Sequence, residues 1–357
     1  MKWNVGWGTI SKCNMNCEFC YSKTRRKETV DLRYADWVRF IDENHTFIHS
    51  INYGTGENSL SNDWFRLVAY IRERYPAIRQ AVTTNGYLSV AVHDRKNMRS
   101  FVKAIDEVDV SLDFADSARH NEFRGQPSAY GWAIDTLKLC MHGNKQVTIV
   151  FLGSQATTSY ENIDGLFSIA KKYNAILRMN IYRPTDGIND FSQQFIISRA
   201  QLVDVLTYIN EKYHILSIGD AYFSPVLTGK ARPDPSGEAS VRILSNGSIT
   251  PSTYLIGENY AVANIKQEGV LQRLEATGTL KKIISEVLPL ECKDCVYTES
   301  CRGGVFDRRY LWHGTLDKKD PYCNCLYTEE VPPVIMVKNQ GFSSVHDGYL
   351  PTMFFKP

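Results

Sequence analysis

The sequence predicts an α/β protein, a partial (β/α)6 barrel followed by a small, cysteine-bearing C-terminal domain. Short apolar segments rich in β-forming residues alternate with helix-like segments over about 190 residues. That alternation is typical of parallel strands joined by helices. The chain has 357 residues, of which 43% are hydrophobic, so it is long enough to bury one large core and a smaller one.

The first strand is expected within residues 3–10, directly before a cysteine-rich loop. Further strands and helices are expected to alternate after it. The strands are 50–53, 80–84, 107–112, 146–152 and 175–182, and the helices are 34–44, 61–75, 94–105, 129–142 and 162–173. Six strands fit an open or partial barrel better than a closed barrel of eight, with ligands expected at the carboxyl ends of the strands.

The second half of the chain is expected to be less regular. A helix is predicted over 199–213, a hairpin turn at Asn246-Gly247 and a helical run near 269–287. The Gly- and Pro-containing segment 226–238 predicts a domain boundary. The predicted parts are a barrel of residues 1–225, a C-terminal domain of residues 226–328 and a tail of residues 329–357 that packs on the body.

Charge and hydropathy exclude several classes of protein. The 41 Lys and Arg residues nearly balance the 39 Asp and Glu residues, so neither a nucleic-acid nor a membrane partner is expected. The sequence has no apolar stretch of about 18 residues, so no transmembrane helix is expected. The first residues lack the apolar core of a signal peptide, so a cytoplasmic location is expected.

Nine cysteines need an explanation. Three lie within residues 13–20 and five within 292–325, which leaves Cys140 alone. Clustered cysteines in a reducing compartment bind metal more often than they form disulfides, and an odd number argues against a complete disulfide framework. The sequence therefore predicts metal binding at both groups.

The first group is Cys13-x3-Cys17-x2-Cys20. Three thiolates can hold three irons of a cubane cluster and leave the fourth iron open, whereas a zinc loop usually has two pairs of ligands. With Phe19 before the last cysteine and Tyr21 after it, the pattern resembles the radical S-adenosylmethionine (SAM) superfamily. The resemblance implies a [4Fe–4S] cluster that binds SAM, a 5′-deoxyadenosyl radical, and a Phe19 ring beside the adenine.

A second motif of the same superfamily follows the expected strand 50–53. Gly54-Thr55-Gly56-Glu57 resembles the Gly-Gly-Glu-Pro segment, with Thr55 in place of glycine and Asn58 in place of proline. By this resemblance the backbone of the two glycines and the Glu57 carboxylate receive the SAM amino group. Glycine permits the close backbone approach, and a carboxylate accepts hydrogen bonds from an ammonium group.

Two more motifs follow in family order. The segment 83–86, which contains Asn85, resembles a Thr-Asn-Gly element, and the segment 111–113 resembles a Ser-Leu-Asp element. The resemblance, which covers about residues 3–190, implies that Ser111 and Arg124 hold the SAM carboxylate or ribose and that Asn85 belongs to the same site. A structural ion pair is the alternative for Arg124.

The second cysteine group is Cys292-x2-Cys295-x5-Cys301, followed by Cys323. Four thiolates can fully ligate a [4Fe–4S] cluster, and a structural zinc site is the alternative. The pattern resembles the SPASM domain or its shortened relative, the twitch domain. Full ligation would leave no iron open to a substrate, so this cluster would transfer electrons or shape the pocket.

SPASM domains usually carry two auxiliary clusters, and this chain departs from that pattern. Ser252 and Val305 stand where cysteines are expected, and no cysteine occurs within 231–237. Three ligands of one cluster are therefore missing. The resemblance implies one auxiliary cluster, ligated by the four cysteines of the second group.

Four residues outside these motifs are weighed separately. Cys325 is either a spare thiol that donates a hydrogen atom or an alternative cluster ligand. Cys140 is expected to be a buried small hydrophobe on a helical face. His346 and Tyr349 are candidates to reach the pocket from the tail. The alternative for His346 is a position on the surface.

The function expected from the resemblance is natural-product tailoring. The radical would abstract a C–H hydrogen from a small molecule (a sugar, aminoglycoside or nucleoside) or from a peptide. Epimerisation would follow from thiol quenching, and oxidation from electron loss to the auxiliary cluster. The alternatives are sulfur insertion from that cluster and a non-catalytic iron–sulfur or zinc protein. A flavodoxin- or ferredoxin-type electron donor is expected, and the twelve residues before Cys13 leave no room there for a leader-peptide domain.

Overall fold

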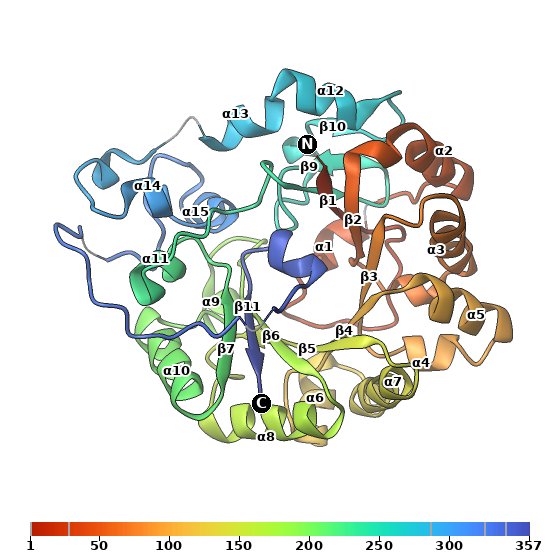
Figure 1. The fold of residues 1–357 in the computed structure, drawn as a ribbon, viewed down its shortest axis with the longest axis horizontal. Helices are drawn as coiled ribbons and strands as arrows, with labels where there is room; N and C mark the ends of the chain where they lie inside the picture. Colours follow the sequence, from red (N-terminus) through yellow and green to blue (C-terminus); the bar gives the residue numbers. More distant parts are fainter. Residues whose placement is uncertain (1, 28, 286–287, 325, 340) are drawn as a thin grey trace.

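The computed structural model describes residues 2–27, 29–285, 288–324, 326–339 and 341–357. These residues form an eleven-stranded sheet in the order β10-β9-β8-β1-β2-β3-β4-β5-β6-β11-β7. Figure 1 shows the strands curving around a centre, with helices α2, α3, α5, α7, α8 and α10 arranged outside them. The fold is therefore a partial barrel that places one end of its strands around a common opening.

Six parallel strands form the barrel wall in chain order, each paired with the next. They are β1 (Trp3–Trp7), β2 (Ile48–Tyr53), β3 (Arg79–Thr84), β4 (Glu107–Ser111), β5 (Gln146–Gly153) and β6 (Ile176–Ile181). The predicted α/β fold class is confirmed. Nearly every residue of β4 and β5 is buried, as expected for parallel strands covered on both faces.

The outer helices lie close to the predicted ranges. They are α2 (Tyr34–Asn44), α3 (Asn62–Arg74), α5 (Arg95–Ala104), α7 (Ala129–His142), α8 (Tyr160–Lys172) and α10 (Arg199–Lys212). Capping side chains define their starts: Ser61 accepts a hydrogen bond from the backbone N–H of Trp64, and Ser198 accepts one from that of Gln201. Cys140 is fully buried on α7, as predicted.

Shorter helices join these elements or follow them. They are α1 (Lys23–Arg26), α4 (Leu88–Ala91), α6 (Ser117–Arg124), α9 (Asp190–Gln193), α11 (Phe223–Thr228), α12 (Val270–Thr277), α13 (Thr279–Ser285), α14 (Thr298–Cys301), α15 (Phe306–His313) and the 3-10 segment η5 (Val345–Gly348). The run predicted near 269–287 is two helices, because Gly278 adopts φ 62° and ends the first. None of the described helices is long and apolar enough to cross a bilayer.

The C-terminal hairpin extends the barrel sheet. β8 (Ser240–Ile243) runs parallel to β1. β9 (Ser248–Thr250) turns back and pairs antiparallel with β8, and β10 (Ala263–Asn264) pairs with β9. The hairpin predicted at Asn246-Gly247 is confirmed, with Gly247 at φ 86°. Because this sheet continues across the boundary proposed at residue 226, the division into three parts stays a prediction.

The tail is part of the sheet and of the barrel interior. β11 (Met353–Lys356) lies between β6 and β7 (His214–Ile218), antiparallel to both. In Figure 1 the blue η5 segment just before it lies at the centre of the ring of strands. The surface position expected for His346 is wrong, since its side chain is fully buried. The apolar residues of β11 explain the difference, because pairing them with β6 draws η5 inside.

Candidate active site

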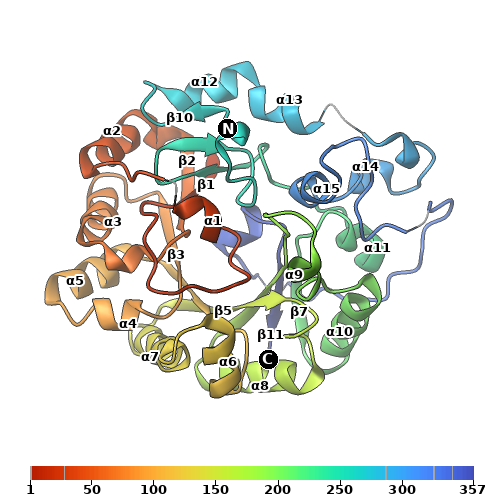
Figure 2. The ribbon, with the colours of Figure 1, turned by 180° about the vertical axis from the view of Figure 1, so that it is seen from behind.

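One cavity of about 190 Å³ lies where the carboxyl ends of the barrel strands meet. The three cysteines of the first group line it, together with segments that follow β2, β3 and β4. Figure 2 shows the cysteine loop and α1 in front of this end of the ring. The structure therefore brings together residues from four strand ends that are far apart in the sequence.

The thiols of the cysteine loop are partly or fully withdrawn from water. Cys17 is buried and its Sγ lies 3.5 Å from the carbonyl oxygen of Arg124, while Sγ of Cys20 lies 3.4 Å from Oγ of Ser22. Burial raises the pKa of Cys13 and raises that of Cys17 to about 11. The Cys13 and Cys17 thiols are therefore neutral at pH 7 until a metal takes the place of the proton.

The turn after β2 is locked against the cysteine loop. Gly56 adopts φ 65°, and a Cβ built on it would lie 2.6 Å from the carbonyl oxygens of Ile10 and Lys12. The backbone N–H of Glu57 donates to the same Lys12 oxygen at 2.9 Å. Thr55, the departure from the family motif, is also left-handed at φ 74°. Glycine is thus required at position 56 by close packing as well as by backbone conformation.

Glu57 holds two strand ends together. Its carboxylate is fully buried and accepts hydrogen bonds from Oγ of Ser59 at 2.6 Å, Oγ1 of Thr84 at 3.0 Å and the backbone N–H of Asn85 at 2.7 Å. It is not among the residues that line the cavity, whereas Gly54, Gly56 and Asn85 are. Its contact with the SAM amino group stays a prediction.

Phe19 and Arg124 lie on one wall of the cavity. The Phe19 ring stacks on Phe123 with centroids 4.3 Å apart, and the Arg124 guanidinium carbon lies 5.1 Å from the Phe19 ring centre. Arg124 also forms a 2.6 Å ion pair with the buried Asp113. Arg124 therefore lines the cavity and also forms a structural ion pair, and its contact with SAM stays a prediction. Ser111 lines the same cavity.

His120, beside this wall, is a fully buried histidine that accepts a hydrogen bond. Its Nδ1 accepts from the backbone N–H of Asp113 at 3.1 Å, which requires the neutral ring. Burial lowers the pKa of His120 to about 4. The ring therefore fixes the loop after β4 and stays uncharged at neutral pH.

The comparison with protein families decides the class of this site. Residues 8–153, which span all three cysteines and the strand-end motifs, match the family model described as the radical SAM superfamily. The chain contains a radical SAM domain. It is therefore an enzyme that uses SAM and a [4Fe–4S] cluster, and the non-catalytic alternative is set aside.

Curated relatives resemble this radical SAM enzyme over most of its length. The mycofactocin maturase MftC of Mycobacterium tuberculosis (strain ATCC 25618 / H37Rv) is 24% identical over 328 residues, which cover 89% of this chain and 81% of the relative. The AdoMet-dependent heme synthase of Methanosarcina barkeri (strain Fusaro / DSM 804) is 22% identical over 349 residues, covering 89% and 95%.

Solved structures show the same fold. Streptococcus suis SuiB bound to precursor peptide SuiA superposes with a TM-score of 0.71 at 18% identity, over 90% of this chain and 75% of SuiB. The structure of anSMEcpe with bound AdoMet and Cp18Cys peptide gives 0.69 at 14% identity, over 89% and 93%. The likeness supports the radical SAM architecture beyond the segment that the family model matches.

The second cysteine group of the enzyme also converges. Cys292, Cys295, Cys301 and Cys323 line one small cavity, walled by the rings of Tyr222, Tyr297 and Tyr327. Burial raises the pKa of Cys292 and of Cys301. Cys325 lies outside the described residues, so its role stays a prediction.

Across the described ranges, no group of three or more His, Cys, Asp or Glu side chains is arranged to hold a metal ion. The choice between an iron–sulfur cluster and zinc at the second cysteine group therefore stays a prediction.

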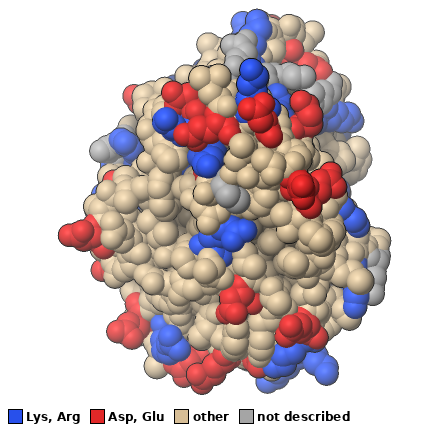
Figure 3. Space-filling model, turned by 90° about the vertical axis from the view of Figure 1, so that its left-hand side faces the viewer, with Lys and Arg blue, Asp and Glu red and all other residues tan. Residues whose placement is uncertain are grey.

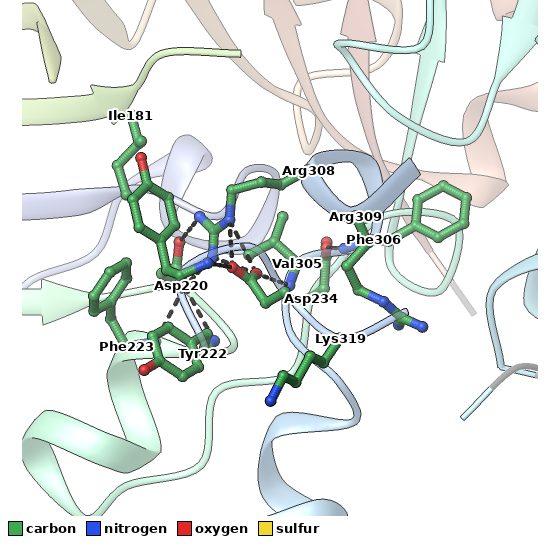
Figure 4. A network of polar contacts seen from close by, with 12 residues as sticks. Ile181, Asp220, Tyr222, Phe223, Asp234, Val305, Phe306, Arg308, Arg309 and Lys319 are labelled. Atoms are coloured by element: carbon green, nitrogen blue, oxygen red, sulfur yellow. Dashed lines mark hydrogen bonds and ion pairs between the residues drawn. The ribbon is translucent and has the colours of Figure 1, made fainter. Parts of the chain in front are cut away.

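A buried ionic network is centred on Arg308 of α15. The Arg308 guanidinium lies between Asp220 and Asp320, at 2.6 and 2.5 Å, and Figure 4 shows its contact with Asp220. Asp320 also accepts a hydrogen bond from the backbone N–H of Val305 at 3.0 Å, and Ser252 donates to Asp307. Of the two positions where the motif lacks cysteines, Ser252 thus hydrogen-bonds through its side chain and Val305 through its backbone alone.

The face of the molecule on the side of α14 mixes basic and acidic residues among those that the structure describes (Figure 3). Figure 3, which faces the side of the molecule where α14 lies in Figure 1, shows basic and acidic residues interspersed around largely uncharged areas. This distribution agrees with the near balance of charge in the sequence.

The tail and the hairpin add site residues that the sequence motifs missed. His346 and Tyr349, which the sequence left open, line the cavity, and so does Arg242 from β8. Nδ1 of His346 lies 2.7 Å from Asp109, which also pairs with Arg178 at 2.8 Å. Burial lowers the pKa of His346. The available signal for Arg242 was a charged residue inside the apolar strand of a predicted hairpin.

Proposed function

We propose that this radical SAM enzyme abstracts a hydrogen atom from a C–H bond of a substrate bound in the barrel cavity, as a step in natural-product tailoring. The observation that carries the proposal is one cavity lined by Cys13, Cys17 and Cys20 together with the strand-end motifs and a polar floor. Among sugar, aminoglycoside, nucleoside and peptide substrates, a peptide is favoured, because SuiB of the same fold was solved with its precursor peptide.

The cavity residues fit the cofactors that the superfamily implies. Cys13, Cys17 and Cys20 line the cavity and are the proposed ligands of the cluster, with Arg26 and Arg124 lining the same cavity. When bound, the cluster and SAM supply the 5′-deoxyadenosyl radical, for which a flavodoxin- or ferredoxin-type donor provides the electron. The proposed SAM contacts are Phe19, Gly54, Gly56, Glu57, Asn85, Ser111 and Arg124.

The protein residues position the reactants and exclude water. The Phe19–Phe123 stack closes one wall, and the buried Glu57 carboxylate holds the ends of β2 and β3 in register. A rigid, water-poor cavity favours hydrogen abstraction at one substrate position, because a reactive radical is protected from side reactions.

The second cysteine group is proposed to hold one auxiliary [4Fe–4S] cluster. Four thiols line its cavity, which matches the number of ligands that such a cluster needs. The Ser252 hydroxyl donates to Asp307 and Val305 has an apolar side chain, so neither position offers the thiolate that a second auxiliary cluster would need.

Anaerobic reconstitution tests the initiation step. The reduced enzyme with SAM is expected to form 5′-deoxyadenosine, measured by liquid chromatography and mass spectrometry. Cys17→Ala should abolish this product and lower the iron content, whereas Cys140→Ala, which changes a buried thiol remote from both cavities, should change neither. Product formation by Cys17→Ala would contradict the proposal.

The fate of the substrate radical is tested by turnover in D₂O. Solvent deuterium at one carbon, lost in a Cys325→Ser variant, indicates thiol quenching and epimerisation. A product two mass units lighter, with no deuterium, indicates oxidation. A gain of sulfur would instead assign sulfur insertion.

A further inference from the structure

Arg242 is a buried cation on the floor of the barrel cavity. It lies on β8, is 1% exposed and lines the cavity. Five arginines line this cavity, and Arg242 is among the three that are almost completely buried, with Arg178 and Arg183. A buried guanidinium is costly unless a counter-charge and hydrogen-bond acceptors surround it.

Three of the four other arginines of the cavity have carboxylate counter-charges. These three form ion pairs with aspartates: Arg124–Asp113 at 2.6 Å, Arg178–Asp109 at 2.8 Å and Arg183–Asp307 at 2.9 Å. Arg26 lies beside the cysteine loop, with Nη2 4.0 Å from Sγ of Cys20. Among the described residues, no carboxylate forms an ion pair with Arg242.

The hydrogen bonds of Arg242 are incomplete as well. Nη2 donates to the carbonyl oxygen of Gly54 at 2.5 Å and to Oγ1 of Thr55, and Nη1 donates to Oη of Tyr349 at 3.4 Å. Nε has no partner within the described part of the chain. A guanidinium has five N–H donors. Donors and charge are therefore left over beside the cavity.

Neighbouring hydroxyls do not neutralise this charge. Tyr349 and Thr253 are hydrogen-bonded to each other through their side chains next to Arg242, and Tyr21 lies close by. Burial raises the pKa of Tyr21, so this phenol is uncharged at pH 7. These hydroxyls can donate to a further acceptor but carry no negative charge.

We propose that the substrate of this cavity carries an anionic group, a carboxylate or a phosphate, that binds Arg242. The proposal rests on the function proposed above and names the substrate class of the same cavity. The planar guanidinium group can bind either oxyanion through two N–H donors. The hydroxyls of Tyr349 and Thr253 lie beside it and can form further hydrogen bonds to the anion. The group would satisfy the free donors and supply the missing charge.

Small probes test the anion site on the reconstituted, SAM-loaded enzyme. N-acetylphenylalanine is compared with N-acetylphenylalaninamide, and phenyl phosphate with phenol, by isothermal titration calorimetry. We expect at least one anion to bind about tenfold or more tighter than its neutral partner, as for a charge-assisted hydrogen bond. The pair that shows the difference distinguishes a carboxylate from a phosphate. Equal binding within both pairs would overturn the proposal.

Variants assign the effect to Arg242. Arg242→Gln should remove the preference for the anion, Arg242→Lys should retain part of it, and Arg66→Gln, at an exposed arginine of α3, should leave it intact. If Arg242→Gln does not fold, the binding of the probe pairs to the wild type and to Arg242→Lys still tests whether Arg242 binds the anion. A folded Arg242→Gln enzyme that still binds the anionic probe as much more tightly than the neutral one as the wild type does would contradict the assignment of anion binding to Arg242.

Two further outcomes distinguish a substrate-anion site from a site for the SAM carboxylate and from a failure of the proposed function. If saturating SAM abolishes anion binding that the SAM-free enzyme shows, the site belongs to the SAM carboxylate and the proposal is wrong. Formation of 5′-deoxyadenosine is measured on the same samples. Its absence would count against the proposed function, whereas loss of anion preference with 5′-deoxyadenosine still formed would count against Arg242 alone.

Discussion

Replacing Gly6 by alanine should displace the tail from the barrel interior. Gly6 lies on β1, and a Cβ built there would stand 1.6 Å from Oη of Tyr349 and 2.1 Å from its Cζ. Carbon atoms in proteins do not approach so closely, so the buried Tyr349 ring must move by about 1.4 Å or more. That movement also breaks the hydroxyl contacts with Thr253 and Arg242.

The expected loss of free energy of unfolding follows from overpacking of the core. Such substitutions cost about 1–3 kcal/mol, and the broken hydrogen bonds place Gly6→Ala at the upper end, about 3 kcal/mol. With an unfolding entropy of about 2.1 cal/mol/K per residue over 357 residues, Tm should fall by about 4 °C.

Thermal unfolding followed by circular dichroism measures this change. Gly131→Ala is the matched control, because a Cβ there meets nothing within 4 Å and alanine favours a helix interior, so its Tm should stay level or rise. In a double-mutant cycle, Gly6→Ala should add little to Tyr349→Ala, since the clashing ring is gone. A Gly6→Ala protein as stable as the wild type would refute the steric argument.

Three further predictions concern buried charge and metal. Arg308→Met leaves two buried aspartates unpaired and should lower the free energy of unfolding by about 3–5 kcal/mol in urea denaturation; a loss below about 1 kcal/mol would contradict the ionic network. The pKa of His120 is about 4 in the folded chain against 6.5 when unfolded, so the unfolded state binds more protons as pH falls. About 3 kcal/mol of stability present above pH 6.5 should thus be lost by pH 4, and His120→Asn should flatten this pH dependence of Tm. Cys17→Ala and Cys301→Ala should each lower the bound iron from about eight to about four atoms per chain, whereas Cys140→Ala should keep about eight.

The sequence predicted most of the barrel because its signals are local. Helix α7 was predicted with both ends correct, since its apolar face and the glycine that follows are encoded within one segment. The order of β1 to β6 followed from alternation alone, because each strand pairs with the next one along the chain.

The floor of the cavity could not be predicted in the same way. His346 reaches Asp109 only because β11 pairs between β6 and β7, and no local pattern encodes that pairing. Glu57 illustrates a second limit. The motif located the residue, but the direction of its carboxylate depends on hydrogen bonds to Thr84 and Asn85 from another strand end.

The position of β11 also affects how the protein is synthesised. β6 and β7 are both made early, yet the strand that joins them follows β7 by about 135 residues, which a ribosome needs roughly 7–27 s to add. During that interval β6 presents an unpaired edge of the kind that recruits other chains. Chaperone co-expression should therefore raise the yield of native enzyme, because a bound chaperone shields this edge until β11 emerges.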